Sequence, residues 1–347
     1  MQKIKITFDG FWKGFDPQNN FLTNALRRNF EVTVLPLGNY SVDAVFYSIY
    51  ATEFLNYNCV RIYYTGENTV PDFNLCDYAI GFEQLALGDR FFRYPVSHAD
   101  FHEDCVLMEN KNKHLPEKPF NRKFCAMVVS NSVNADSFRE DFFYRLSGYR
   151  MVDSGGKYLN NIGHPEGVTD KKIFLRQYKF SLAFENVSHV GYCTEKLPQS
   201  FASGTIPIYW GDPNVTQYFN PKSFINLHDY GRVDDAISEI KRIDNDEHLY
   251  LSMLYEPAII KPEFLCENLD REFEKWLVHI FVSDIANRLR ANRNGYARIY
   301  SEKQRRLLSY RKDSDMVLMR RIKYIFTHSP KDVIKKIMYK LKSRDVK

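Results

Sequence analysis

The residues whose types and spacing could do chemistry are densest in residues 178–212. There an apolar run ends at residues 184–186, a glycine-containing loop follows, and a helix is expected to begin at residues 194–196. A strand, a loop and a helix N-terminus in this order place free backbone N–H groups at the carboxyl edge of a parallel sheet. Glu195 could accept hydrogen bonds from a ribose diol, and Lys196 offers a point charge to phosphates. The pattern predicts a diphosphate site.

A purely structural role explains the same residues equally well. Thr194 would then be the N-cap of the helix, and Glu195 would only complement the helix dipole. The residues alone leave both readings open.

Two weaker patterns could hold a metal. Asp244-Asn245-Asp246 matches the D-x-D arrangement that holds a metal against a sugar diphosphate, but a solvated turn between two helices is expected there. His98 and His102 stand four residues apart, as metal ligands on a helix can, but the irregular context favours a surface loop. P-loop, G-x-G-x-x-G, G-x-S-x-G and H-E-x-x-H motifs are absent, so the commonest ATPase, dinucleotide, hydrolase and zinc-protease readings lose their main support.

Two series of alternating strands and helices are expected to position these residues. Strands are predicted at residues 3–8, 31–35, 43–47, 60–64 and 78–81, with a helix at 21–29. The polar, proline-containing stretch at 96–123 is interpreted as an interdomain linker. A buried strand at 124–129 then begins a second series of alternating strands and helices. Strands that alternate with helices predict parallel sheets, and hence two Rossmann-like domains.

Composition narrows the class of protein. The 347 residues carry a net charge of +5, but residues 302–347 hold 15 Lys and Arg against 5 Asp and Glu. The rest of the chain is therefore acidic, with a net charge of −5, which argues against nucleic-acid binding. Six cysteines without a C-x-x-C pair favour free thiols in a reducing compartment.

The basic tail carries its own pattern. Ile334, Ile337, Met338 and Leu341 form one apolar stripe flanked by cations. This pattern predicts an interfacial helix on an anionic membrane surface. A helix packed on the body and an oligomer contact are the alternatives. Without a signal peptide or a long apolar run, the expected location is cytoplasmic, or peripheral on the inner face of the cytoplasmic membrane.

Several ordered motifs closely resemble the signature of the α1,3-fucosyltransferases, glycosyltransferase family 10, and the bacterial members most strongly. The motifs are FEN at 184–186, YCTEK at 192–196, GTIPIYWG at 204–211, FNPKSFIN at 219–226 and VSN at 129–131, and earlier YTGEN at 64–68, FNL at 73–75 and DYAIGF at 77–82. In all, the resemblance covers roughly residues 1–280.

The resemblance implies a GT-B fold. This is an α/β architecture of two Rossmann-like domains facing across a cleft. Residues 1–115 would bind the acceptor, residues 116–281 would bind GDP-fucose, and residues 282–347 would form a basic, amphipathic, helical tail.

The implied reaction is transfer of L-fucose, with inversion, from GDP-fucose to the 3-hydroxyl of N-acetylglucosamine. The acceptor would be a Galβ1,4GlcNAc (LacNAc) oligosaccharide or a lipid-linked glycan, giving a Lewis x-type product in protein or lipopolysaccharide glycosylation. Two alternatives stay open: the same fold with α1,4 or mixed linkage, and a non-catalytic module that binds glycan or lipid.

The family motifs also imply roles for single residues. Glu67 matches the general base that deprotonates the acceptor hydroxyl. Arg139 matches the arginine that clamps the diphosphate, and Lys196 matches a second phosphate cation. Glu195 matches a carboxylate that faces the ribose or the fucose. Further donor contacts are Asn186 and Tyr192.

These charges imply that no metal cofactor is required. Mn or Mg ions would only stimulate turnover by binding free GDP. Arg145 serves as an internal control and is expected at the surface. His189 lies in a loop that departs from the bacterial pattern and is expected to be solvated, while Trp12 and Phe15 would either stack on a sugar or close the core.

Overall fold

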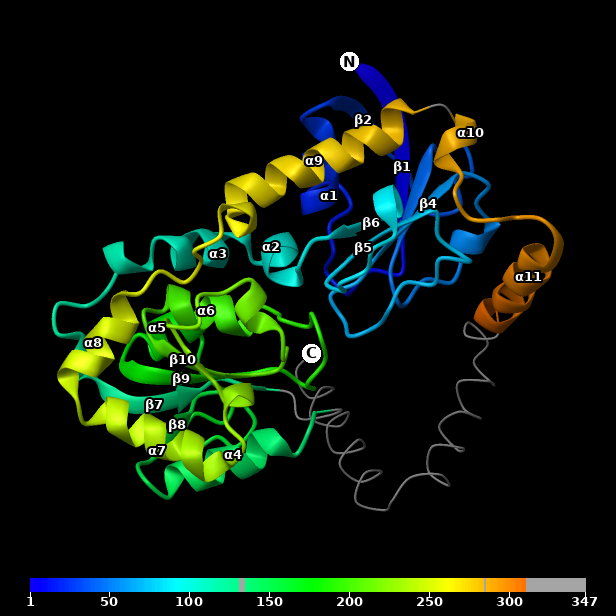
Figure 1. Ribbon diagram of the computed structural model, residues 1–347. Coiled ribbons are helices and arrows are strands. Elements are labelled where there is room, and N and C mark those ends of the chain that lie inside the picture. Colours follow the sequence, from blue (N-terminus) through cyan, green and yellow to red (C-terminus); the bar gives the residue numbers. More distant parts are fainter. Residues whose placement is uncertain (131–134, 284, 310–347) are drawn as a thin grey trace, which may run out of the picture. The chain divides into compact units, whose positions relative to one another are not determined.

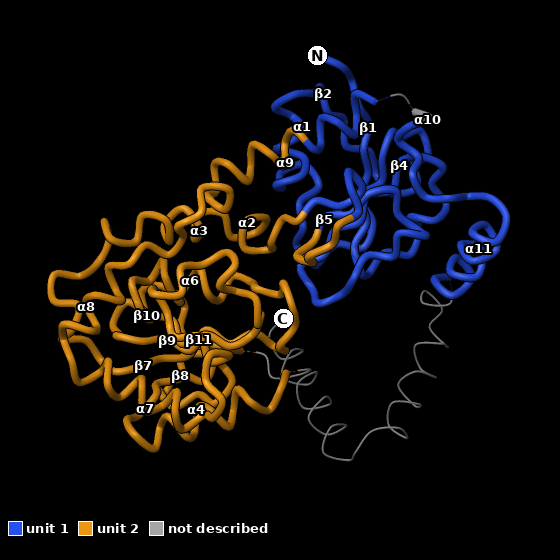
Figure 2. The backbone as a smooth tube through the Cα atoms, in the orientation of Figure 1, with its two compact units in different colours: residues 1–80, 87–92, 276–347 blue, residues 81–86, 93–275 orange. Residues whose placement is uncertain are grey.

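The computed structural model describes residues 1–130, 135–283 and 285–309, which form two compact units (Figure 2). Unit 1 consists of Met1–Ile80, Leu87–Phe92 and the described residues from Trp276 onward; unit 2 consists of Gly81–Ala86 and Arg93–Lys275.

These units differ from the ranges expected from sequence. Residues 96–123 are not a linker, because they form α2 (Val96–Asp100) and α3 (His102–Glu109) within unit 2. Helix α3 packs against α6 (Lys196–Ala202) through the buried Cys105 and Met108. The long helix α9 (Cys266–Val282), which the sequence reading missed, begins in unit 2 and continues in unit 1 from Trp276.

Unit 1 is built on a sheet with the strand order β2-β1-β3-β4-β5-β6. Its strands are β1 (Gln2–Asp9), β2 (Phe30–Val34), β3 (Ala44–Tyr47), β4 (Val60–Tyr64), β5 (Tyr78–Gly81) and β6 (Phe91–Arg93). Each neighbouring pair from β2 to β5 is parallel, as predicted. Helix α1 (Phe21–Arg27) begins after Asn20, whose side chain accepts hydrogen bonds from the N–H groups of Leu22 and Thr23.

Unit 2 is built on a sheet with the order β11-β10-β9-β7-β8, in which every pair is parallel. Its strands are β7 (Lys123–Met127), β8 (Val152–Ser154), β9 (Tyr178–Phe184), β10 (Ile206–Trp210) and β11 (Ile225–Asn226). Its other helices are α4 (Phe138–Ser147), α5 (Lys171–Leu175), α7 (Val233–Asp244) and α8 (Glu247–Tyr255).

Alternation along β9 explains the layers of unit 2. Leu182 and Phe184 pack into the core shared with α4 and α7, whereas Ala183 packs on the side of α6. Figure 1 shows α4 and α7 on one side of this sheet and α5 and α6 on the other. All residues of β9 are buried, as expected of a strand covered on both faces, and its two polar residues, Lys179 and Ser181, have partners in Asp244 and Thr205.

The strand order of unit 2 predicts where a ligand binds. From β7 the chain passes to β8 on one side and then crosses back to β9 on the other side of β7, so the strand order reverses between β7 and β9. Ligands of such sheets bind outside the carboxyl ends of the strands at this reversal. The expected place for a site is therefore beyond Met127 and Phe184.

The predicted tail is described as far as residue 309 and contains α10 (Ile285–Arg288) and α11 (Gly295–Ser309). Helix α11 packs on unit 1: the Tyr300 hydroxyl donates to Asp72 at 2.7 Å, and Arg305 Nη2 donates to the Leu55 carbonyl at 2.7 Å. The apolar stripe at 334–341 lies outside the described residues. None of the described helices has both the length and the apolar character that a membrane span requires.

Candidate functional site

Glu185 is the structural centre of the region beyond β9. It is completely buried, and its carboxylate accepts hydrogen bonds from Thr194 N (2.7 Å), Thr194 Oγ1 (2.7 Å) and Lys196 Nζ (3.0 Å). Glycine is needed at position 211, because a Cβ there would lie 2.4 Å from Glu185 Cγ. The buried carboxylate therefore ties the start of α6 to the end of β9.

The start of the helix falls within the predicted range, but its N-cap is not Thr194. Helix α6 begins at Lys196, and Thr194 is not its N-cap, because its hydroxyl donates to Glu185. Glu195 occupies the N-cap position without a capping hydrogen bond from its side chain. The position of Lys196 is therefore set by charge and hydrogen bonding and not by capping.

Lys196 lies between two carboxylates. Its Nζ is 3.0 Å from Glu185 Oε2 and 3.2 Å from Glu195 Oε1. Burial alone would lower the pKa of Lys196, but the charges of Glu185 and Glu195 outweigh it and raise that pKa. Burial would likewise raise the pKa of Glu195, yet Lys196 and Lys171 hold it below its ordinary value. Glu195 and Lys196 are therefore both charged at neutral pH.

Lys171, the first residue of α5, is the cation that the sequence reading missed. Its Nζ donates to Gln199 Oε1 of α6 at 2.8 Å, and burial lowers its pKa to about 8 against the opposing charge of Glu195. The sequence signal was small: Lys171 follows Asp170, whose carboxylate caps α5 by accepting from Ile173 N at 2.9 Å.

Arg139 is a buried cation with unused donors. It is 1% exposed, and its Nη1 donates to Asn186 Oδ1 at 2.9 Å. Nε and Nη2 have no hydrogen-bond partner within the described part of the chain. The backbone of Asn186 also accepts from Asp136 N at 2.7 Å, so the segment before α4 is joined to the end of β9. The guanidinium thus has free N–H groups that an added anion can use.

Arg145, the internal control for Arg139, lies at the surface as expected. Its side chain is 40% exposed, and it pairs with Asp234 at 2.6 Å and Asp141 at 3.9 Å. Helix α4 thus carries Arg145 at the surface with two acidic partners, and Arg139 in the interior with the neutral side chain of Asn186 as its partner.

Tyr192 and His189 pack against residues 81–86 of the same unit. The ring of Tyr192 meets Phe82 edge to face at 5.0 Å, and His189 Nε2 lies 3.1 Å from Glu83 Oε1. Gly191 has φ +82°, and a Cβ there would approach the Phe82 carbonyl to 2.8 Å. His189 is therefore not simply solvated, since its ring has an acidic partner.

Glu67 lies in unit 1, in the turn after β4. It is exposed, its N–H donates to Thr65 Oγ1 at 3.0 Å, and its carbonyl accepts from Thr69 N at 2.7 Å. The Thr65 hydroxyl satisfies the turn, so the Glu67 carboxylate is not needed for that purpose.

The two aromatic residues near the N-terminus have different roles. Phe15 stacks on Phe11 at 4.2 Å and contacts Phe8 at 5.1 Å, so it closes the core. Trp12 contacts Phe15 at 5.0 Å but remains 40% exposed.

The two weaker motifs differ in part from expectation: residues 244–246 do join two helices and Asn245 and Asp246 are exposed, but Asp244 and His98 are buried. Asp244 is buried, not solvated, and binds Lys179 and Arg150, while Asp246 caps α8 through Leu249 N at 3.1 Å. His98 lies on α2 and is 7% exposed, so it is not in a surface loop.

Two parallel α/β sheets, with a cationic site beyond the carboxyl end of β9, define a GT-B glycosyltransferase fold. Two family descriptions match this chain: the alpha-(1,3)-fucosyltransferase FucT N-terminal domain over residues 6–99, and the glycosyltransferase family 10 (fucosyltransferase) C-terminal domain over residues 118–256. The chain belongs to glycosyltransferase family 10.

Individual relatives agree with this assignment. The alpha-(1,3)-fucosyltransferase FucT of Helicobacter pylori is 38% identical over 291 residues, which cover 73% of this chain and 60% of the relative. A putative fucosyltransferase of Acanthamoeba polyphaga mimivirus is 34% identical over 43% of this chain and 26% of its own length. The chain thus spans at most 60% of the length of these curated relatives.

Solved structures extend the likeness over more of the chain. A crystal structure of an alpha1,3-fucosyltransferase with GDP-fucose is 31% identical and superposes with a TM-score of 0.71, covering 82% of this chain and 92% of the other. The same kind of enzyme with GDP gives a TM-score of 0.72 at 31% identity, covering 84% and 93%.

Proposed function

We propose that this protein is an α1,3-fucosyltransferase that moves L-fucose from GDP-fucose to the 3-hydroxyl of N-acetylglucosamine in Galβ1,4GlcNAc-type acceptors. Family membership and the likeness to an α1,3-fucosyltransferase structure with GDP-fucose support the reaction class. The observation that carries the proposal is the buried guanidinium of Arg139, which has two unpartnered nitrogens among the described residues, beside the strand end that carries Asn186.

The proposed donor site is electrostatically suited to a diphosphate. The negative charge of Glu185 interacts with all three cations, Lys171, Lys196 and Arg139. Glu195 adds a second carboxylate. Among these five groups the cations exceed the carboxylates by one, so a bound diphosphate meets net positive charge. Arg139 can donate two hydrogen bonds to phosphate oxygens and stabilise the charge that grows as GDP leaves.

Glu67 is the proposed general base. Inversion in a single displacement requires a base for the acceptor hydroxyl, while the leaving group departs from the opposite face of the sugar. A carboxylate just beyond a parallel strand, exposed and not consumed by its own turn, is suited to this role.

The donor-binding roles of Glu195, Tyr192 and Asn186 remain part of the same proposal. Glu195 would accept hydrogen bonds from the ribose or the fucose. The proposed charge compensation by Arg139 and the two lysines makes a metal unnecessary for the transfer, with Mn or Mg ions stimulating turnover through free GDP.

The proposed acceptors are oligosaccharides or lipid-linked glycans that contain LacNAc, with a Lewis x-type product. The cationic, aliphatic tail at 302–347 would bring the enzyme to an anionic membrane surface on the cytoplasmic side.

One experiment tests the reaction as a whole. The full chain is incubated with GDP-fucose and a panel of type 1 (Galβ1,3GlcNAc) and type 2 (Galβ1,4GlcNAc) oligosaccharides, and the new linkage is located by NMR. Transfer to the 3-hydroxyl of type 2 acceptors is the expected result. Fucose on the 4-hydroxyl of type 1 acceptors would instead show mixed linkage, and glycan binding without transfer would favour a non-catalytic module.

A further inference from the structure

A buried cluster in unit 2 has no part in the proposed transfer. His98 of α2, Cys105 of α3 and Cys266 at the start of α9 are 7%, 0% and 3% exposed. One potential ligand atom from each residue lies within 4.8 Å of the other two. Of these three residues, the sequence pattern indicated only His98 as a possible metal ligand, because the two cysteines are 161 positions apart and form no C-x-x-C pair.

The spacing of the three atoms suits a soft metal ion. Zinc bound at about 2.3 Å by thiolates and about 2.0–2.1 Å by imidazole sets its tetrahedral ligand atoms roughly 3.5–3.8 Å apart. Cys105 Sγ already lies 3.9 Å from His98 Nδ1. Small side-chain movements would close the site.

The two ring nitrogens of His98 have different surroundings, and Nδ1 is the one that faces the cluster. His98 Nε2 is buried and has no hydrogen-bond partner within the described residues, while Nδ1 faces Ser97 Oγ at 3.3 Å and the thiol of Cys105. A buried polar nitrogen without a partner costs free energy. A metal bound through Nδ1 would not give Nε2 a partner, but it would fix the proton on Nε2 and orient the ring.

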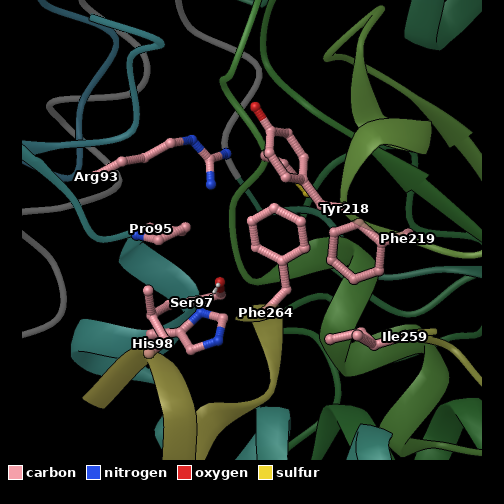
Figure 3. A pocket seen from close by; sticks show the side chains of 10 residues that line it. Arg93, Pro95, Ser97, His98, Tyr218, Phe219, Ile259 and Phe264 are labelled. Atoms are coloured by element: carbon pink, nitrogen blue, oxygen red, sulfur yellow. Dashed lines mark hydrogen bonds between the residues drawn. The ribbon is translucent and has the colours of Figure 1, made fainter. Parts of the chain in front are cut away.

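A small cavity adjoins His98, although neither Cys105 nor Cys266 lines it. Its volume is about 30 Å³, enough for a water molecule. Figure 3 shows the ring of His98 beside Ser97, with Phe264 and Tyr218 across the cavity. Two thiolates, one imidazole and one water make a four-coordinate zinc site of known type.

We propose that His98, Cys105 and Cys266 bind one zinc ion, with a water molecule as the fourth ligand. On binding, both thiols release their protons to solvent and coordinate as thiolates.

The ion would join α2, α3 and α9 at a point that supports the proposed donor site. On α3, the carboxylate of Asp104 accepts from Lys172 Nζ of α5 at 2.6 Å and from Gln199 Nε2 of α6 at 2.8 Å. Those two helices carry Lys171 and Lys196. The metal is thus a positioning element in this proposal and takes no part in the chemistry of transfer.

Cobalt provides the spectroscopic probe. The untagged full chain is purified under reducing conditions, stripped with a chelator and titrated with Co²⁺, followed by Zn²⁺. We expect one Co²⁺ per chain, thiolate-to-cobalt charge-transfer absorption, and displacement by Zn²⁺. The melting temperature should rise with Zn²⁺, because the ion binds the folded state.

Three variants locate the site. Cys105→Ala and Cys266→Ala should each weaken metal affinity by more than about tenfold and reduce the charge-transfer absorption. Cys125→Ala, which removes a buried thiol of β7 outside the cluster, should leave both unchanged. Circular dichroism confirms that each variant is folded. X-ray absorption of the zinc-loaded wild type, with two sulfur neighbours and one imidazole, tests the site without any variant.

The proposal is overturned by a wild-type chain that takes up no stoichiometric metal, or by charge-transfer absorption that persists in both cluster variants. A Cys105–Cys266 disulfide in the freshly purified protein, with no metal uptake after reduction, would also overturn it.

Discussion

Arg139 Nη1 donates a hydrogen bond to Asn186 Oδ1 at 2.9 Å, although the two residues are 47 positions apart. The bond joins the first turn of α4 to the residue that follows Glu185 after β9. Asn186 is a neutral partner, so it orients the guanidinium without cancelling its charge. The remaining donors of Arg139 can therefore serve a ligand.

Replacing Arg139 should separate ligand binding from stability. We expect Arg139→Met to weaken GDP binding roughly 10- to 100-fold, the effect of losing about 1.5–3 kcal/mol of charge-assisted hydrogen bonding. Without GDP, the variant should unfold at the same temperature as the wild type or higher, because a buried cation with unmet donors is removed. Calorimetry and thermal unfolding measure the two effects.

The matched control for Arg139 is Arg145→Met on the same helix, which should leave GDP affinity unchanged. Unchanged affinity in Arg139→Met, or a large loss of stability without GDP, would contradict the assignment of Arg139 to the diphosphate.

Glu67→Gln should lower kcat for transfer to LacNAc by about 10²- to 10⁴-fold, because the amide cannot accept the proton of the acceptor hydroxyl. GDP-fucose affinity should change little, since the proposed donor site lies in unit 2. Steady-state kinetics and calorimetry check the two statements. Glu31→Gln, at another exposed carboxylate of unit 1, is the control. Full turnover in Glu67→Gln would remove this residue from the base role.

Glu185→Gln should destabilise unit 2. The amide keeps the size of the side chain, but it leaves the partly exposed Glu195 as the acidic partner of Lys196. It also turns an N–H group toward another donor, and the total cost should be about 3–5 kcal/mol. Denaturant unfolding measures the loss. Glu166→Gln, in an exposed pair with Lys157, should change the free energy of unfolding by no more than about 0.5 kcal/mol. A wild-type unfolding curve for Glu185→Gln would refute the buried-anchor role.

Because of Lys171, the free energy of unfolding should rise with pH above 8, whereas GDP affinity should fall. Its pKa is about 8 in the folded chain against an ordinary 10.5. Between these two values the unfolded chain holds more protons, so the contribution of Lys171 to stability rises with pH from 8 to 10.5. A bound diphosphate favours the protonated amine, so GDP affinity should fall as pH rises above 8.

The comparison that tests Lys171 is with Lys171→Met. In the variant, stability and GDP affinity should each lose the pH dependence that Lys171 causes. Burial also lowers the pKa of Lys111 to about 8, but Lys111 is present in both proteins and contributes equally to both. Identical pH profiles of GDP affinity in the two proteins would show that Lys171 does not meet the diphosphate.

Deleting the residues after Leu307 should reduce sedimentation with vesicles that contain anionic phosphatidylglycerol, and turnover of soluble LacNAc should be unchanged. Vesicles of neutral phosphatidylcholine are the control. Equal binding of the truncated and full chains would exclude the tail as the membrane contact. Loss of folding on truncation would instead show that the tail packs on the body.

Local pattern alone predicted most of the secondary structure. The strands at 60–64 and 78–81 were placed at their observed bounds, because alternation and apolar runs are properties of neighbouring residues. The motif residues Arg139 and Asn186 do meet, and the family was recognisable from ordered short motifs.

Tertiary structure decided which side chains are buried and what they contact. Glu185 was read as part of a motif, but only folding makes it a buried acceptor for Thr194 and Lys196. Lys171 reaches the site because α5 packs beside α6, and His98 meets Cys105 and Cys266 only where three helices converge. Periodicity reports contacts within one element, whereas burial, pKa and ligand geometry depend on elements that are distant in sequence.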